Sequence, residues 1–322
     1  MKQQFSSTRE AFAQALIDSA QKNPNIVALT ADLKSSLKLD TFEQQFPEQL
    51  FEMGICEQNM ASSACGMAKL GKIPFICSYA VFSPGRNWDQ IRVGACYSNL
   101  PLKVIGGHAG LVTGSDGATH QALEDIALMR VLPNMEVYVP SDPQEAYDIT
   151  THMCKSKKPN YLRLNRIKQN DIDFAEKFSF QRARLVVNKG DDCVIFATGV
   201  CVEIAKQAVE ELEYEHIKCR VLSIHSIKPI DVKRIIKELK QCGCVVSVEE
   251  HQIHGGLGSA ISEILSQHHP TVQEYVAIQD TFGESGDSDE LLKKYGISVE
   301  NVKKKVKDVL KRKNINNKAL SS

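Results

Sequence analysis

Short apolar runs that alternate with helix-like segments constrain the fold of this chain more than any other feature. In the first half, apolar runs bounded by turn residues predict strands at 26–31, 73–79, 103–106, 135–139 and 161–164. Helical patterns lie between several of them, and the first of these, over 7–20, begins with Ser7 and Glu10 at capping-box spacing. Strands that alternate with helices in this way indicate a parallel sheet.

The second half repeats the pattern after a polar stretch without a clear period, from about 168 to 190. Its apolar runs predict strands at 193–197, 219–224, 244–248 and 273–278, again with helical patterns between them. We therefore predict an α/β protein with two successive doubly wound domains whose sheets are mainly parallel. The expected parts are a first domain over 1–170, a linker over 171–188, a second domain over 189–312 and a flexible tail over 313–322.

The charge balance and the cysteines argue against several classes of protein. Lys and Arg together number 39, as do Asp and Glu, so no excess charge points to nucleic acid or to an anionic membrane. The polar start is unlike a signal peptide, and the longest nearly apolar run, 193–202, is too short to span a bilayer, so we expect a cytoplasmic protein. The ten cysteines lack metal-ligand spacing, so we expect reduced thiols and no metal site.

Side chains suited to chemistry are densest between residues 54 and 121. The run Gly-Ile-Cys-Glu-Gln-Asn-Met over 54–60 leads into a helix rich in Ala, Ser and Gly. Such small side chains let other backbones approach closely, which suits a helix at a subunit interface. Glu57 lies in the first turn of this helix, where it either complements the helix dipole or serves a functional site.

Two further features follow predicted strands. Tyr79 and Phe82 lie three residues apart beyond a strand end, where they form either part of the core or a stacking platform. The glycine-rich loop over 106–121 then contains His108, Asp116 and His120. Loops at the carboxyl ends of parallel strands build the sites of α/β proteins, and imidazoles with a carboxylate suit a polyhydroxylated substrate. Structural roles for these side chains remain the alternative.

Together and in this order, these motifs resemble transketolases. The resemblance in the first half rests on Glu57 in its run over 54–60, on Phe82 with the following Asp89 and Gln90, and on His108 with the following Asp-Gly-x-Thr-His-Gln. In the second half, the runs at 248–251, 255–258 and 282–286 are similar to the C-terminal domain of transketolases. The resemblance covers the chain from about residue 5 to 310.

The resemblance implies thiamine diphosphate as the cofactor, with its pyrimidine end bound by this chain. By resemblance, Glu57 hydrogen-bonds N1′ of the aminopyrimidine and thereby helps the cofactor to deprotonate itself. Phe82 is expected to stack on the pyrimidine with Tyr79 beside it. Asp32, just past the first strand, resembles the family's acidic residue near the cofactor and the adjoining subunit.

The resemblance also implies substrate contacts. The residues expected to line the sugar channel are His108, Asp116 and His120, and the catalytic residues are expected to be Glu57, His108 and His120. The residues similar to the family's phosphate-binding set are Arg9, Ser36 and Arg166, with His108 contributing. Paired guanidinium groups favour a tetrahedral dianion, so this set predicts a phosphorylated sugar.

One motif of full-length transketolases is missing. We find no Gly-Asp-Gly run followed by Asn, and the runs at 190–192 and 286–288 do not match it. The resemblance therefore implies that an N-terminal transketolase subunit holds the diphosphate and its Mg²⁺ or Ca²⁺. We expect an α₂β₂ heterotetramer that transfers a two-carbon ketol unit from a ketose phosphate to an aldose phosphate.

Three alternatives stay open. Deoxyxylulose-phosphate synthases and 2-oxo acid dehydrogenase β subunits share the architecture. The synthases typically have Arg where His108 stands, and the dehydrogenases lack the Asp-Gly-x-Thr-His block. The third alternative is a non-catalytic assembly subunit. The sequence does not name the sugar, so the pentose phosphate pathway and a specialised sugar pathway are both possible, and so are a phosphate and a sulfonate on the substrate.

Overall fold

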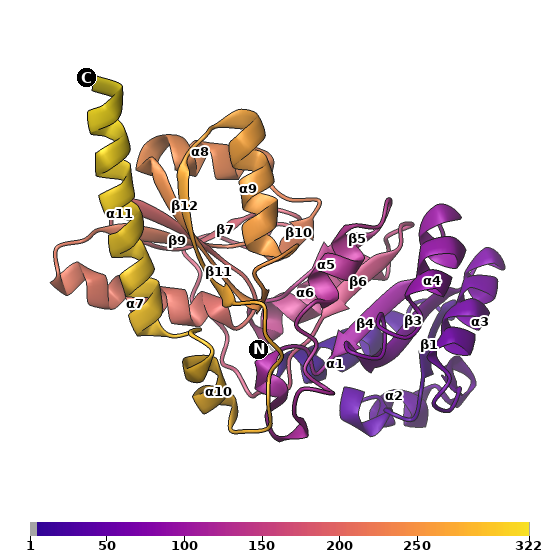
Figure 1. Ribbon diagram of the computed structural model, residues 1–322. Coiled ribbons are helices and arrows are strands. Elements are labelled where there is room, and N and C mark those ends of the chain that lie inside the picture. Colours follow the sequence, from indigo (N-terminus) through magenta and orange to yellow (C-terminus); the bar gives the residue numbers. More distant parts are fainter. Residues whose placement is uncertain (1–4, 322) are drawn as a thin grey trace.

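The computed structural model describes residues 5–321 and shows two α/β units (Figure 1). The elements of the first are α1 Thr8–Ala20, β1 Ile26–Thr30, η1 Ser35–Leu37, α2 Asp40–Gln45, η2 Pro47–Gln49, β2 Leu50–Glu52, α3 Glu57–Lys69, β3 Ile73–Tyr79, α4 Trp88–Gln90, η3 Ile91–Tyr97, β4 Lys103–Gly107, η4 Leu111–Asp116, α5 Asp125–Arg130, β5 Glu136–Tyr138, α6 Pro143–Met153 and β6 Asn160–Arg163. The elements of the second are β7 Arg184–Asn188, β8 Cys193–Ala197, α7 Cys201–Tyr214, β9 Cys219–Ser223, β10 Ser226–Lys228, α8 Val232–Cys242, β11 Cys244–Gln252, α9 Leu257–His268, β12 Val272–Ile278, α10 Ser288–Lys294 and α11 Val299–Ser321.

Each unit is built on a mainly parallel sheet. Within the described residues, the first sheet has the order β10-β5-β6-β4-β3-β1-β2 and the second has the order β12-β11-β8-β9-β7. The antiparallel pairs are at the edges, where β10 meets β5 and β7 meets β9. The predicted fold class is therefore confirmed.

The two faces of the first sheet are covered by different helices. Along β1, Ile26 and Ala28 join the cluster that contains the apolar face of α1, including Phe12. Val27 and Leu29 join the opposite cluster, which contains Met60 and the small residues of α3. This alternation follows from the two-residue period of side chains on a strand, and it places the start of α3 beside the carboxyl end of the sheet.

Helix α1 begins with the predicted cap. The Ser7 hydroxyl accepts a hydrogen bond from the Glu10 amide at 3.3 Å, as a capping box requires. The Glu10 carboxylate, however, accepts from the amide and hydroxyl of Ser6, at 3.1 and 2.6 Å, rather than from the amide of Ser7.

Two expected boundaries differ from the structure. Strand β7, Arg184–Asn188, pairs with β9, so the last part of the predicted linker belongs to the second sheet. Helix α11 runs to Ser321, so residues 313–321 are helical rather than a separate tail, whereas Ser322 lies outside the described residues. The helix packs Val302, Val306 and Val309 into the core of the second unit, which anchors its first turns.

A segment of the second unit completes the first sheet. Strand β10, Ser226–Lys228, pairs with β5 in the antiparallel direction. Just before it, the His225 carbonyl accepts a 2.8 Å hydrogen bond from the amide of Val139. The two units therefore share a sheet edge, and their relative position is held by backbone hydrogen bonds as well as by side chains.

All ten cysteines lie within the described residues and are free, and all except Cys56 are buried. Across residues 5–321, no helix is both long enough and apolar enough to cross a membrane.

Candidate cofactor and substrate site

The predicted site residues collect at one edge of the first sheet. Strands β1, β3 and β4 are parallel neighbours, so the residues that follow them lie at the same edge. Tyr79 ends β3 and His108 follows β4, while Glu57 opens α3 beside them. The chain thus brings together side chains that are far apart in sequence.

Glu57 is a buried carboxylate with a cationic partner. Its side chain is 2% exposed, and Arg86 donates from Nη1 to both carboxylate oxygens, at 3.1 and 3.3 Å. Asn87, which is fully buried, donates from Nδ2 to the main-chain oxygen of Glu57 at 3.2 Å and to the Ser83 hydroxyl at 3.1 Å. A residue that only complements a helix dipole needs no such burial, so this environment favours the functional interpretation of Glu57.

Tyr79 and Phe82 form a parallel aromatic pair that is partly exposed. Their ring planes differ by 4° and their centroids are 6.0 Å apart. The Arg86 guanidinium carbon lies 4.2 Å from the centroid of the Phe82 ring. His120 approaches Phe82 edge-on, with centroids 5.3 Å apart. The two rings and the buried Glu57 carboxylate therefore lie near one another, with the Arg86 guanidinium over Phe82.

His108 is held in a constrained position at the centre of this cluster. Its φ is 50°, its ring stacks on Tyr79 with centroids 3.9 Å apart, and Thr113 donates from its hydroxyl to the His108 carbonyl at 2.5 Å. Arg9 Nη1 lies 3.2 Å from His108 Nε2. Because a guanidinium only donates, Nε2 accepts and the ring proton lies on Nδ1, a buried atom without a partner among the described residues.

The surroundings of His108 keep its imidazole neutral. Burial is the main cause, and the nearby Arg9, Arg166 and His120 add to it, so that the pKa of His108 falls to about 3. The neutral ring therefore carries its single proton on the buried Nδ1, which has no partner among the described residues.

The basic rim predicted from separate stretches of the chain is assembled. Arg9 donates from Nη1 to the Ser36 carbonyl at 2.7 Å and from Nη2 to the Arg166 carbonyl at 2.9 Å. The Tyr79 hydroxyl donates to the Ser36 hydroxyl at 3.3 Å. Arg166 donates from Nη1 to the Thr113 carbonyl at 2.8 Å and to Asp116 Oδ1 at 3.0 Å. Asp116 thus lies against Arg166, a pairing that the sequence did not suggest.

Asp32 differs from the other predicted residues. Its side chain is exposed, and its backbone has a φ of 59°. Its amide donates to Glu52 Oε1 at 2.8 Å, and the same oxygen accepts from Gly54 at 2.9 Å. Asp32 therefore lies at the rim beside β2, outside the aromatic cluster.

Sequence reasoning missed Arg86 and Asn87, although both lie in the run 79–90 that carried the resemblance. Their positions four and five residues after Phe82 could have indicated a role in the site. A turn that follows a strand end brings such residues back toward the end of the neighbouring strand. Arg163 is buried as well, and its Nε donates to the buried Asp125 at 3.0 Å.

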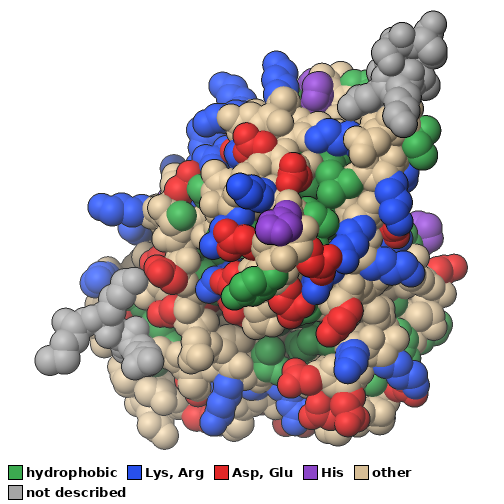
Figure 2. Space-filling model, turned by 90° about the vertical axis from the view of Figure 1, so that its left-hand side faces the viewer, with side chains coloured by type: hydrophobic (Ala, Val, Ile, Leu, Met, Phe, Trp, Pro, Cys, Tyr) green, Lys and Arg blue, Asp and Glu red, His purple; other side chains and the backbone are tan. Residues whose placement is uncertain are grey.

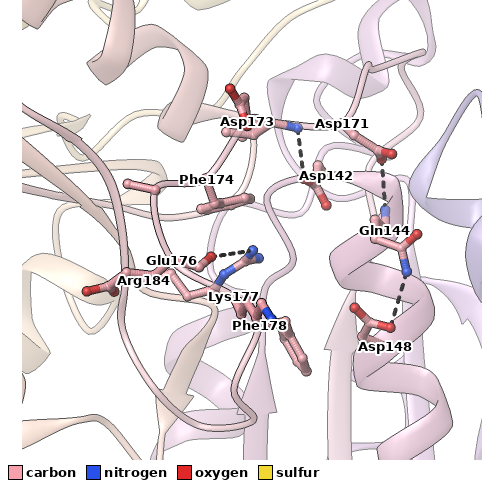
Figure 3. A pocket seen from close by; sticks show the side chains of 12 residues that line it. Asp142, Gln144, Asp148, Asp171, Asp173, Phe174, Glu176, Lys177, Phe178 and Arg184 are labelled. Atoms are coloured by element: carbon pink, nitrogen blue, oxygen red, sulfur yellow. Dashed lines mark hydrogen bonds between the residues drawn. The ribbon is translucent and has the colours of Figure 1, made fainter. Parts of the chain in front are cut away.

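A separate cavity of about 600 Å³ lies along the connection between the units (Figure 3). Its polar side chains bond mainly to one another and to nearby backbone. Asp142 accepts from the Ile172 amide at 2.9 Å, and Gln144 donates to Asp148 at 3.2 Å. Its lining includes none of the predicted site residues. Acidic and basic side chains both occur over the face in Figure 2, with basic ones more frequent toward the upper left.

Comparisons with known proteins agree with this site. The family model for the transketolase pyrimidine-binding domain matches residues 5–170, and the model for the transketolase C-terminal domain matches residues 182–302. The chain therefore belongs to the transketolase family. Within that family it is similar along nearly its whole length to proteins that are named as a C-terminal section or described as a split-gene transketolase.

Three similar proteins define this group. A putative transketolase C-terminal section from Methanocaldococcus jannaschii is 37% identical over 96% of this chain and 98% of its own length. The 6-deoxy-6-sulfo-D-fructose transketolase subunit SqwH of a Clostridium strain is 35% identical over 95% of each chain. A solved structure described as a split-gene transketolase in an inactive β4 tetramer is 40% identical, with a TM-score of 0.88 over 95% of this chain and 99% of that chain.

Members of this family depend on thiamine diphosphate. The residues present fit its aminopyrimidine end, because a buried carboxylate, an aromatic face and a buried unpartnered imidazole N–H meet at one place. Among the described residues, no group of three or more His, Cys, Asp or Glu side chains is placed to hold a metal ion.

Proposed function

We propose that this chain is the C-terminal subunit of a two-chain transketolase that transfers a two-carbon ketol unit from a ketose to an aldose. The observation that carries the proposal is the buried Glu57 carboxylate beside the parallel Tyr79 and Phe82 rings. A carboxylate and an aromatic face are the groups that an aminopyrimidine needs for one hydrogen bond and one stacking contact.

The proposed roles follow from the chemistry of each side chain. When bound, thiamine diphosphate supplies the nucleophilic carbon that takes up and releases the two-carbon unit. Glu57 accepts a hydrogen bond from the pyrimidine ring and Phe82 holds the ring by stacking. His108 lines the sugar channel, and His120, whose Nδ1 lies 2.9 Å from the Thr119 hydroxyl, contacts the oxygens of the two-carbon unit. Asp32 faces the adjoining subunit at the rim.

A second polypeptide completes the proposed site. Its task is to bind the diphosphate and the Mg²⁺ or Ca²⁺, for which this chain has no Gly-Asp-Gly motif. The names of the relatives support this division, since they describe a C-terminal section and a subunit. An α₂β₂ assembly with cofactor sites between unlike chains is the arrangement that we propose.

The proposed substrates carry an anionic group. Arg9 and Arg166 meet at the rim through the bond from Arg9 Nη2 to the Arg166 carbonyl, and their guanidinium groups both lie near His108. Two such groups favour a phosphate or a sulfonate. The relative that is named for a sulfonated fructose fits the same chemistry. Because deoxyxylulose-phosphate synthases typically have Arg at this position, the His at position 108 favours a transketolase over such a synthase.

Reconstitution tests the proposal. The purified chain with thiamine diphosphate and Mg²⁺ should transfer no ketol unit, whereas addition of an N-terminal transketolase subunit should restore transfer between a ketose phosphate and an aldose phosphate. Glu57→Gln in the same complex is the control for chemistry at this site. Full activity of the chain alone, or undiminished turnover by Glu57→Gln, would show that the proposal is wrong. A screen of ketose donors with the active complex then identifies the sugar.

A further inference from the structure

The run Glu249-Glu250-His251 at the end of β11 lies in the second unit and is buried in full. The three side chains are 1%, 2% and 0% exposed. Burial of ionisable groups is costly unless each has partners, so their partners indicate what the run does. The resemblance singled out this run without assigning a task to it.

The side chains of Glu249 and Glu250 bind different parts of the chain. Glu249 accepts from the amides of Leu257 and Gly258, at 2.6 and 2.8 Å, and thus holds the start of α9 within its own unit. Glu250 reaches into the first unit, where its Oε1 accepts from the Val112 amide at 2.7 Å. Val112 belongs to η4, in the loop that carries His108, Asp116 and His120.

Arg163 also contacts Glu250. Its Nη2 donates to the Glu250 carbonyl at 2.9 Å and to the Ala122 carbonyl at 3.3 Å, while its Nη1 lies 3.6 Å from Glu250 Oε2. Ala122 directly follows the substrate loop, and Val112 lies within it. Gly110 also borders the carboxylate, since a Cβ there would lie 2.2 Å from the Glu250 carboxyl carbon. Glu250 and Arg163 therefore contact the loop within η4 and directly after its end.

A second segment of the same unit also contacts the loop. Gln121 donates from Nε2 to the Glu284 carbonyl at 2.9 Å, and the Ser288 hydroxyl donates to the Val112 carbonyl at 3.1 Å. Gly117, at a φ of 78°, lies so close to the second unit that a Cβ would come within 2.5 Å of the Ser285 hydroxyl. The segment 284–288 thus packs directly on the loop.

The geometry points to a role for the second unit: it positions the substrate-binding loop, with Glu250 as the positioning residue. The route has few steps. Glu250 holds the amide of Val112. The next residue, Thr113, donates to the His108 carbonyl at 2.5 Å and accepts from Arg166 at 2.8 Å. Displacement of Val112 therefore moves the groups that support His108 and Arg166. The effect on catalysis rests on the proposed function, whereas the effect on the loop does not.

Amide hydrogen exchange on the full chain tests the positioning directly. Glu250→Ala leaves the Val112 amide without its acceptor, so we expect amides between 110 and 117 to exchange at least about tenfold faster than in the wild type. Glu249→Ala is the matched control, because it removes an equally buried carboxylate that also binds backbone amides but does not touch the loop. Its faster exchange should be confined to the start of α9. Unchanged exchange in Glu250→Ala, or equal effects of both variants on the loop, would overturn the inference.

A milder variant covers the case in which the buried glutamate variants do not fold. Ser288→Ala removes only the bond to the Val112 carbonyl from a partly exposed position. It should speed exchange around Val112 and leave the second sheet unchanged, and exchange at the wild-type rate there would count against the inference.

Kinetics in the reconstituted complex separate positioning from mere loss of stability. Glu250→Ala should raise the KM for the anionic acceptor and lower kcat, and Glu250→Gln, which keeps an oxygen for Val112, should recover part of both. Glu249→Ala should change neither. If the complex proves inactive even as wild type, the proposed function fails while the exchange experiment still decides the role of Glu250.

Discussion

Arg86 binds the Glu57 carboxylate through Nη1, at 3.1 and 3.3 Å, while its guanidinium lies over the Phe82 ring. It therefore occupies the space between the two residues that are proposed to bind the pyrimidine. A ring that stacks on Phe82 and bonds to Glu57 requires this side chain to move. In the chain alone, Arg86 is the cationic partner of the buried Glu57 carboxylate. In the proposed complex, the cofactor replaces Arg86 as the partner of Glu57.

Replacement of Arg86 should separate these two effects. Arg86→Ala leaves Glu57 without its cation, and because Arg86 is 46% exposed the free energy of unfolding of the chain alone should fall by only about 1 kcal/mol. The affinity of the complex for thiamine diphosphate should rise, since no side chain has to be displaced. Denaturant unfolding and calorimetric titration measure the two quantities. The exposed Arg92→Ala is the control, and weaker cofactor binding by Arg86→Ala would assign Arg86 to the bound state instead.

Glu57 should matter for turnover far more than for stability. Glu57→Gln removes the charge that tunes the cofactor, so kcat in the complex should fall by about a hundredfold or more. The fold should persist, because Arg86 is half exposed and water can hydrate it once its partner is neutral. Turnover and the midpoint of urea unfolding are measured on the same preparations. A variant with near-normal kcat would return Glu57 to the role of a helix-dipole residue.

Arg166 should determine the affinity for an anionic acceptor. Charge-assisted hydrogen bonds are worth about 1.5–3 kcal/mol, so Arg166→Ala should raise the acceptor KM by about tenfold to a hundredfold and change kcat less. The measurement compares kcat/KM for matched acceptors with and without the anionic group. Lys168→Ala, which removes an exposed cation two residues away, should behave as wild type. Equal values for both acceptors in the wild-type complex would favour an enzyme for neutral sugars.

His108 should make the chain less stable in acid. Its folded-state pKa, about 3, lies below the ordinary value of 6.5, so the folded state resists protonation more than the unfolded state does. The corresponding stability is complete above pH 6.5 and is lost as the pH falls from there toward 3. Between pH 7.5 and pH 5, this group should account for about 2 kcal/mol of the free energy of unfolding.

Urea unfolding at these two pH values tests the point with His108→Asn, which cannot take up a proton. This variant should lose about 2 kcal/mol less than the wild type on acidification. His254→Asn, a change at an exposed histidine, should follow the wild type. If His108→Asn shows the same pH dependence as the wild type, His108 is not the source of the acid sensitivity.

The sequence by itself determined most of the strands and the family. Apolar runs bounded by turns marked strands such as 73–79 and 193–197, which the structure places at Ile73–Tyr79 and Cys193–Ala197. Such patterns are local, because the spacing of apolar residues within one short stretch of sequence indicates which face of a strand or helix is buried. The motifs around Glu57 and His108 were equally local, so the family and most of the site residues could be predicted.

Only the tertiary structure decided which distant groups meet. Strand β10, Ser226–Lys228, is too short for its apolar pattern to reveal that it pairs with β5 in the other unit. The pairs Arg86–Glu57 and Arg166–Asp116 span 29 and 50 residues, and Glu250 lies 138 residues from Val112. No local pattern encodes such pairs, because they depend on how two sheets and their loops pack. That packing brought these residues together at one edge of the first sheet and set the second unit against the loop that follows β4.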